Sequence, residues 1–249
     1  MEKSALTGSV ALVTGAARRI GAEIARTLHG MGMDLAVHYH VSECEALGLV
    51  ESFNRIRKGS AIAVKADLNE PQSEKALIQQ VVAHWHRLDV LVNNASRFFR
   101  TPVAEVDEAA WNDLMNSNLK APFFLSQAAA PHLALNHGVI INITDVHAER
   151  PMMGYPIYSI AKAGLAYMTK VLAIELGPNI RVNAVAPGSI IWPEGENSLS
   201  EEAKQKIIDR TALQKVGCEK DIAKAVLFLI KDAPFITGQI IAVDGGRTI

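Results

Sequence analysis

A phenol, an ammonium group and a carboxylate lie close together in residues 143–162, which read ITDVHAERPMMGYPIYSIAK. Tyr158 precedes Lys162 by four residues, so the two side chains share one helix face if the apolar run 160–176 is helical. Asp145 follows the run GVIINIT, which predicts a buried strand, and open parallel sheets bind ligands at the carboxyl ends of their strands. The three groups are therefore candidates for moving a proton to or from a bound ligand.

Short runs rich in Val, Ile and Ala alternate with stretches of helical composition. Because they show little polar–apolar alternation, the runs predict seven parallel strands covered on both faces, at residues 9–15, 34–40, 61–67, 88–95, 138–144, 180–188 and 239–246. Helices are predicted between them, over 21–31, 71–87 and 107–136. We expect a Rossmann-type doubly wound α/β sheet with helices on both faces, forming a single domain over residues 1–249. The irregular stretch that begins at Ser189 predicts a substrate lid around 189–213.

Composition excludes several classes of partner. With 25 basic and 26 acidic residues the formal net charge is −1, so neither nucleic acid nor an anionic membrane is expected as a partner. Two cysteines, Cys44 and Cys218, do not suggest a disulfide framework or a cysteine-based zinc site. The run HWH at 84–86 predicts no metal site, because residues two apart on a helix do not face each other. The first residues lack the apolar core of a signal peptide and no apolar run approaches a membrane span, so a soluble cytoplasmic protein is expected.

The turn after the first predicted strand, TGAARRIG at 14–21, is rich in glycine and carries two arginines. Glycine lets such a turn come close to a pyrophosphate on a helix N-terminus, although an ordinary strand-to-helix loop would look similar. The second strand ends in HYHVS, with no acidic residue to hold an adenosine ribose hydroxyl. Arg18, His40 and Ser42 can instead donate hydrogen bonds to a 2′-phosphate. The sequence therefore favours NADPH over NADH, unless the polar strand end binds no ligand.

With TGAARRIG, NNAS at 93–96, Asn118, YSIAK at 158–162 and PG at 187–188, the chain resembles a short-chain dehydrogenase/reductase. In that family the tyrosine donates a proton, the lysine lowers the tyrosine pKa and holds the nicotinamide ribose, and the asparagine completes a proton relay. The resemblance implies these roles for Tyr158, Lys162 and Asn118, and a homotetramer built from helices in 107–136 and 158–177. The cofactor-binding residues that we expect are Gly15, Arg18, Arg19, Ile20, Gly21, Tyr39, His40, Ser42, Asp67, Leu68, Asn93, Ala95, Ser96, Thr144, Tyr158, Lys162, Pro187, Gly188 and Ser189.

Pro122 predicts an irregularity in the helix that carries Asn118. In a regular helix the proline ring would clash with the carbonyl of Asn118, four residues earlier. We expect a kink that leaves this carbonyl free to bind a water molecule, which suits a proton relay, although a kink made only for packing would look the same.

Asp145 departs from the family pattern. Most members have a serine thirteen residues before the tyrosine, where it hydrogen-bonds a substrate carbonyl oxygen. A carboxylate would repel a developing alkoxide, whereas beside a ring nitrogen it can deliver a proton or accept an N–H, which suits a C=N bond. The alternative interpretation is that Asp145 only caps a loop or holds Tyr158 in place and takes no part in proton transfer.

This substitution, with Arg19, HYHVS and NNASRFFRTP at 93–102, makes the chain similar to the pteridine reductases of the family. These enzymes stack a flat pterin between the nicotinamide and an aromatic ring, which implies that role for Phe98, although Phe98 and Met152 would also suit core packing. Val41 stands where several pteridine reductases carry an arginine. The expected substrate-binding residues are Arg19, Ser96, Phe98, Asp145, Met152, Tyr158 and Trp192.

We therefore expect NADPH-dependent reduction of a pterin or folate at a ring C=N bond, with dihydropterin converted to tetrahydropterin. One alternative is a carbonyl reductase of the same family, acting on 3-oxoacyl carriers, sugars or steroids. A second is a module that senses NADPH without turnover, which the intact Tyr158, Lys162 and Asn118 disfavour.

Overall fold

The predicted strands form one parallel sheet in the order β3-β2-β1-β4-β5-β6-β7, in a computed structural model that describes residues 6–192 and 198–249. The strands are β1 (Val10–Val13), β2 (Asp34–Tyr39), β3 (Ala61–Lys65), β4 (Val90–Asn93), β5 (Val139–Ile143), β6 (Arg181–Pro187) and β7 (Ile240–Val243). Each falls inside the range predicted from its apolar run. The strand order reverses between β1 and β4, the kind of switch point at which open α/β sheets bind ligands.

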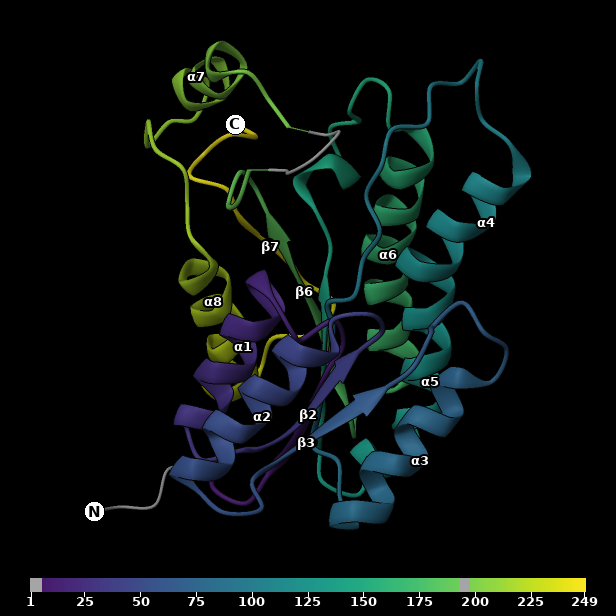
Figure 1. Ribbon diagram of the computed structural model, residues 1–249, viewed down its shortest axis with the longest axis vertical. Helices are drawn as coiled ribbons and strands as arrows, with labels where there is room; N and C mark the ends of the chain where they lie inside the picture. The colour runs from purple at the N-terminus through teal and green to yellow at the C-terminus, as the bar shows by residue number, and fades with distance from the viewer. Residues whose placement is uncertain (1–5, 193–197) are drawn as a thin grey trace.

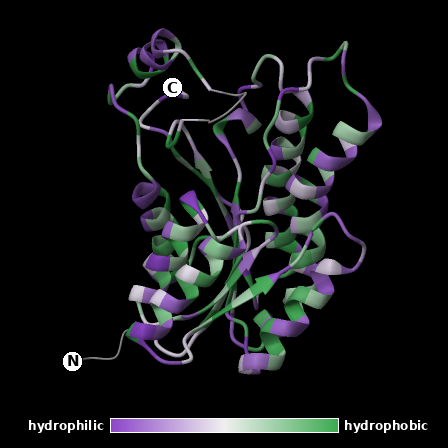
Figure 2. Ribbon diagram, in the orientation of Figure 1, coloured by the Kyte–Doolittle hydropathy of each residue, from purple (hydrophilic) through white to green (hydrophobic). Residues whose placement is uncertain are grey.

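Helices cover both faces of this sheet (Figure 1). One core cluster packs α1 (Arg19–Gly30), α2 (Glu43–Ile56) and α8 (Glu219–Lys231) against one face. The other packs α3 (Ser73–Trp85), α5 (Ala121–Ala134) and α6 (Pro156–Glu175) against the opposite face. Apolar residues therefore concentrate along the strands and the inner sides of these helices (Figure 2). The Rossmann-type, single-domain α/β fold predicted from the sequence is confirmed.

The helix predicted over 107–136 is interrupted before Pro122. Asp107 caps α4 (Glu108–Met115) through its side chain, which accepts the amide of Ala110. A π-helical turn, Asn116–Lys120, then connects α4 to α5. Pro122 then lies in the first turn of α5, directly after this widened turn. The helix is thus irregular where Pro122 predicts it, in the form of a π-helical turn that carries Asn118, and the free Asn118 carbonyl stays a prediction.

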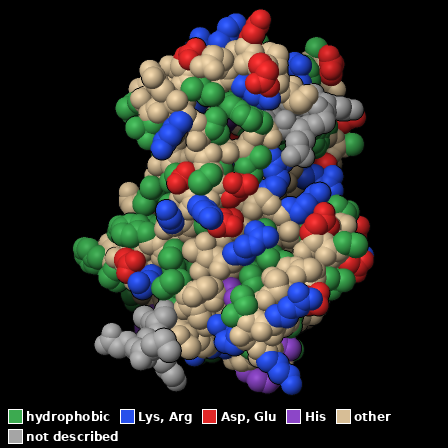
Figure 3. Space-filling view, turned by 60° about the vertical axis from the view of Figure 1, so that its left-hand side comes forward, with side chains coloured by type: hydrophobic (Ala, Val, Ile, Leu, Met, Phe, Trp, Pro, Cys, Tyr) green, Lys and Arg blue, Asp and Glu red, His purple; other side chains and the backbone are tan. Residues whose placement is uncertain are grey.

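Helix α6 is the only described helix long and apolar enough to cross a membrane by length and composition, and 56% of its apolar window is buried inside the fold. The buried residues of α6 include Tyr158 and Lys162. This burial is that of a core helix which carries candidate site residues. On the face shown in Figure 3, basic and acidic side chains are interspersed.

The predicted lid contains a helix that was not predicted from the sequence, beginning at the end of the irregular stretch 189–202. Helix α7 (Glu201–Asp209) is capped by Ser200, whose hydroxyl accepts the amide of Ala203, and it has no buried residue. It stands above the strand ends near the chain's C-terminus (Figure 1). Residues 193–197 of the predicted lid lie outside the described residues.

Candidate active site

A cavity of about 870 Å³ opens at the carboxyl ends of the strands. Its wall comes from the glycine-rich turn after β1, the ends of β2 and β3, the loops after β4 and β5, the start of α6 and the segment after β6. That volume lies in the upper part of the range for ligand and cofactor pockets. The parallel topology, which aligns all carboxyl ends on one edge, brings these distant segments together.

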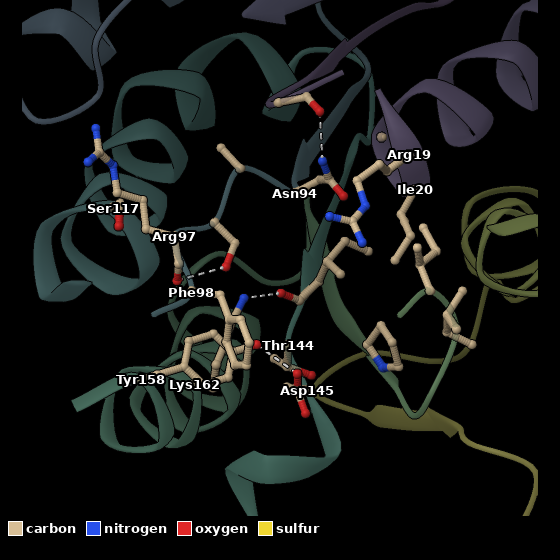
Figure 4. Close-up of a pocket in the computed structure, with 18 of the residues that line it drawn as sticks. Arg19, Ile20, Asn94, Arg97, Phe98, Ser117, Thr144, Asp145, Tyr158 and Lys162 are labelled. Atoms are coloured by element: carbon tan, nitrogen blue, oxygen red, sulfur yellow. Dashed lines mark hydrogen bonds between the residues drawn. The ribbon is translucent and has the colours of Figure 1, made fainter. Parts of the chain in front are cut away.

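Tyr158, Asp145 and Lys162 meet in this cavity (Figure 4). The Tyr158 hydroxyl donates a hydrogen bond of 2.6 Å to Asp145 Oδ2. The other carboxylate oxygen of Asp145 accepts the backbone N–H of His147 at 2.8 Å, in the short 3₁₀ turn Val146–Ala148 that follows β5. Lys162 Nζ donates to the carbonyl of Ile143 at 2.9 Å and lies 5.7 Å from the centre of the Tyr158 ring. Each group of the predicted triad therefore has a fixed partner.

Burial changes the proton affinity of both α6 side chains. The pKa of Tyr158 is raised well above its ordinary value, first by burial and then by the charge and hydrogen bond of Asp145. The lowered tyrosine pKa expected from the lysine is thus wrong for this arrangement, because burial, and after it the adjacent Asp145 carboxylate, raise the pKa of the phenol. Burial lowers the pKa of Lys162 to about 8, against a smaller opposing effect of Asp145. Tyr158 is accordingly a protonated phenol at neutral pH.

Asn118 lies behind the cavity wall. It is fully buried in the π-helical turn, and its Oδ1 accepts the hydroxyl of Ser96 at 2.6 Å. Its Nδ2 donates to the carbonyls of Arg97 and Leu114. Asn118 therefore contacts the cavity through Ser96, which lines it.

Asn93 was expected to bind cofactor, but the structure does not place it on the cavity wall. It is the last residue of β4, and its amide donates to Asn142 Oδ1 at 2.8 Å, inside the core. The next residue, Asn94, lines the cavity instead and donates to the carbonyls of Thr14 and Gly15. Side chains alternate between the faces of a strand, so a shift of one residue exchanges the two roles.

The glycine-rich turn has the geometry of a nucleotide-binding turn. Gly15 has a φ of +60°, and a Cβ on Gly21 would overlap the carbonyl oxygen of Gly15. Arg19, at the position where a middle glycine is common, also adopts a left-handed φ of +55° and begins α1. Its guanidinium donates to the carbonyl of Trp192 at 3.1 Å, so the turn is joined to the base of the predicted lid.

Two of the three predicted 2′-phosphate ligands, Arg18 and His40, lie beside carboxylates. Arg18 lies 3.6 Å from Glu45 and His40 lies 3.4 Å from Asp67. Val41, which stands where several pteridine reductases carry an arginine, is 77% exposed. The Arg18 and His40 side chains are 59% and 40% exposed in these contacts, so an anionic ligand can reach both.

Phe98 is half-buried on the cavity wall. Its ring stacks on Tyr155 with centroids 4.6 Å apart and planes 8° from parallel, and meets the Tyr158 ring edge-on at 4.9 Å. The loop that carries Phe98 is held by Arg97, which donates to Asp113 of α4 at 2.9 Å. The other oxygen of Asp113 accepts Asn69 from the loop after β3.

All other residues expected to bind cofactor or substrate line the cavity. Asn94, Tyr155 and His38 also line the cavity and were not predicted as site residues, although all three lie in the motifs described above. Further lining residues that were not predicted are Asn69, Arg97, Arg100, Ser117, His147 and Arg247. Among the described residues, no group of histidine, cysteine and acidic side chains could hold a metal ion.

Known proteins resemble this chain over nearly its whole length. A family model described as enoyl-(acyl carrier protein) reductase matches residues 15–248. Pteridine reductase 1 of Leishmania tarentolae is 35% identical, over 98% of this chain and 97% of the relative. 3-Oxoacyl-(acyl-carrier-protein) reductase FabG of Staphylococcus aureus is 38% identical, over 95% of this chain and 96% of the relative. A blue fluorescent protein from a metagenomic library, solved in complex with NADPH, superposes with a TM-score of 0.91 at 36% identity, covering 98% of this chain and 99% of that one.

Proposed function

We propose that this chain, which belongs to the short-chain dehydrogenase/reductase family, is an NADPH-dependent pteridine reductase. The observation that carries the proposal is the 2.6 Å hydrogen bond between Tyr158 and Asp145, a carboxylate at the position where most members have a serine. In the proposed reaction a dihydropterin is reduced to a tetrahydropterin, with dihydrofolate or an oxidised pterin as related substrates.

Asp145 favours a C=N bond over a ketone for an electrostatic reason. Ketone reduction develops negative charge on oxygen, which a carboxylate in the same buried site would destabilise. Reduction of C=N ends in a neutral N–H, and the nitrogen needs a proton rather than a donor for an oxyanion. A carboxylate that shares a hydrogen bond with a phenol can hold and pass on that proton.

In this scheme NADPH supplies the hydride that adds to the carbon of the C=N bond. The proton that adds to nitrogen comes through the Tyr158–Asp145 pair. Lys162, anchored on the Ile143 carbonyl, holds positive charge beneath the Tyr158 ring and stabilises the phenolate that forms when the proton leaves. Asn118, which the family resemblance gives a place in the proton relay, would act through Ser96, whose hydroxyl donates to Asn118 Oδ1 at 2.6 Å.

The cofactor half of the proposal has support from both the site and a relative. Two arginines flank the N-terminus of α1, a site that suits a pyrophosphate, and HYHVS lacks an acid that would repel a 2′-phosphate. The blue fluorescent protein with the same fold is described in complex with NADPH. The residues on this wall therefore fit NADPH in charge and in hydrogen-bond donors.

Phe98 and Tyr155 supply the aromatic surface that a flat substrate needs. Their rings are stacked, Phe98 also meets the Tyr158 ring edge-on, and all three residues line one cavity. A pterin packed against this surface would present its ring edge to Asp145 and Ser96. Arg19, Met152 and Trp192 complete the proposed substrate site, with the segment around 189–213 as a lid.

A second candidate, 3-oxoacyl reduction, is favoured by the 38% identity to FabG and by the description of the matching family model. The active-site carboxylate argues against it. Assaying NADPH consumption with dihydropterins, dihydrofolate and a 3-oxoacyl thioester in parallel separates the two candidates. We expect turnover with the dihydropterins at least tenfold more efficient in kcat/KM than with the thioester, and the reverse preference would refute the proposal.

The proposal also includes a homotetramer in the cytoplasm. Large apolar side chains remain exposed on α4, α5 and α6, and surface of this kind usually marks an interface. They include Trp111, Phe123, Phe124, Ile160, Tyr167, Val171 and Ile174. Cys44 and Cys218 are exposed free thiols, which a reducing compartment preserves.

A further inference from the structure

We infer that His38 is a positioning residue for the cofactor: its imidazole sets the glycine-rich turn by accepting the backbone N–H of Gly15. The distance from Gly15 N to His38 Nδ1 is 3.0 Å. On the opposite side of the ring, Nε2 lies 3.2 Å from the carbonyl oxygen of Ala66. The side chain thus joins the turn after β1 to the loop after β3.

The two partners determine the protonation state of the ring. A backbone N–H can only donate and a carbonyl can only accept, so Nδ1 must carry the lone pair and Nε2 the proton. A charged imidazolium would point an N–H at the Gly15 N–H and lose that hydrogen bond. His38 is 2% exposed.

Burial keeps the ring neutral at physiological pH. It is the largest cause that lowers the pKa of His38, to about 4. The hydrogen bond to Ala66 and the charge of Asp67 act in the opposite direction, and His40 lowers the pKa further. Nδ1 therefore remains a hydrogen-bond acceptor throughout the physiological pH range.

The hydrogen bonds at His38 fix the conformation that the turn needs. Gly15 has a φ of +60°, and the next amide, of Ala16, donates to the backbone carbonyl of His38 at 2.9 Å. Two successive backbone N–H groups of the turn, those of Gly15 and Ala16, therefore donate to His38. A pyrophosphate must then be held by amides nearer the start of α1 and by the adjacent arginines, and their position depends on the turn being held in place.

This role differs from ordinary core packing, because His38 also lies on the cavity wall, between segments that carry predicted cofactor residues. Gly15 belongs to the pyrophosphate turn, and Ala66 precedes Asp67 and Leu68. The imidazole thus connects the pyrophosphate end to the adenosine end of the site without touching the substrate end.

Three variants test the acceptor directly. In His38→Asn the side-chain oxygen can take the place of Nδ1 and accept from Gly15. In His38→Gln the amide can reach Ala66 but leaves Gly15 without the acceptor, and His38→Leu removes both. We expect the NADPH Kd, measured by fluorescence titration without pterin, to rise at least tenfold in the Gln and Leu variants and less than about threefold in Asn.

Thermal unfolding of the same variants separates positioning from general stability. If the NADPH Kd follows Tm across all three variants, or if a folded Leu variant binds NADPH as tightly as wild type, the inference is wrong. For the case in which Gln and Leu do not fold, ¹⁵N NMR of wild-type histidines gives an independent answer, since protonation of His38 on Nδ1 instead of Nε2 would contradict it. Because no pterin is present, failure of the pteridine assignment would leave these results unchanged.

Discussion

Replacement of Asp145 by Asn is predicted to remove most pterin turnover while the site stays folded. The two oxygens of Asp145 accept from Tyr158 at 2.6 Å and from the His147 amide at 2.8 Å. An asparagine has one acceptor oxygen, and the His147 N–H can only donate, so that oxygen stays on His147. The amide NH₂ then faces Tyr158, and the phenol changes from donor to acceptor.

The size of the effect follows from the loss of one positioned proton-transfer group. Such groups contribute about 10²–10⁴-fold in rate, or about 3 to 5 kcal/mol of barrier. The Tyr158 pKa should also fall relative to wild type, because the charge and hydrogen bond of Asp145 raise it now, although burial, the largest cause, remains.

Steady-state kcat for dihydropterin, its pH profile and the NADPH Kd are the measurements. We expect kcat to fall by about 10²–10⁴-fold with the NADPH Kd within a few fold of wild type. Asp145→Ser is the matched variant, since it restores the commoner residue and should lose pterin turnover equally. An Asn variant with wild-type kcat would show that Asp145 only orients the substrate, and a fully active Ser variant would make the residue structural.

Four further predictions follow from the same geometry. Arg18→Ala should raise the KM for NADPH roughly tenfold and that for NADH much less, because NADH lacks the 2′-phosphate with which Arg18 can pair; equal changes for both cofactors would contradict this. Phe98→Ala should raise the pterin KM roughly tenfold or more, since stacking on an aromatic ring is worth about 1–3 kcal/mol, while NADPH binding stays constant; an unchanged KM would make Phe98 a packing residue. The pKa of His38 is about 4 in the folded protein against an ordinary value of 6.5. Between these two pH values the unfolded chain binds more protons than the folded protein, so the free energy of unfolding falls as the pH decreases from 6.5 to 4. From pH 7 to pH 5 the free energy of unfolding, measured with urea, should fall by about 2 kcal/mol. His38→Asn should reduce this dependence on pH, and an equal dependence in both proteins would contradict a neutral, buried His38. Light scattering at micromolar concentration should give the mass of a tetramer, and a monomer would refute the proposed assembly.

The sheet could be predicted from sequence because its signal is local. The central strands β1, β4 and β5 are buried along their whole length and rich in Val, Ile, Leu and Ala, so the apolar run itself marks the element. The spacing of Tyr158 and Lys162 is also local, within one turn of α6.

Features that depend on pairing across the fold could not be predicted in the same way. The side chain of Asn93 faces Asn142 and not the cavity, and only the strand register decides which of two adjacent asparagines lines the site. The contact of His38 with Gly15 joins residues 23 positions apart and needs the β1–β2 pairing to be known. Helix α7 was missed although Ser200, followed by Glu201 and Glu202, is a recognisable helix start.

The destination of the hydride tests the proposed reaction most directly. The enzyme is incubated with dihydropterin and NADPH that carries deuterium at the transferred position, and the products are analysed by mass spectrometry. We predict a tetrahydropterin with one deuterium on the former C=N carbon, formed by wild type and lost in Asp145→Asn. A parallel incubation replaces the dihydropterin with a 3-oxoacyl thioester. If the pterin stays unreduced and unlabelled while the thioester gives a deuterated alcohol, the pteridine reductase assignment is contradicted.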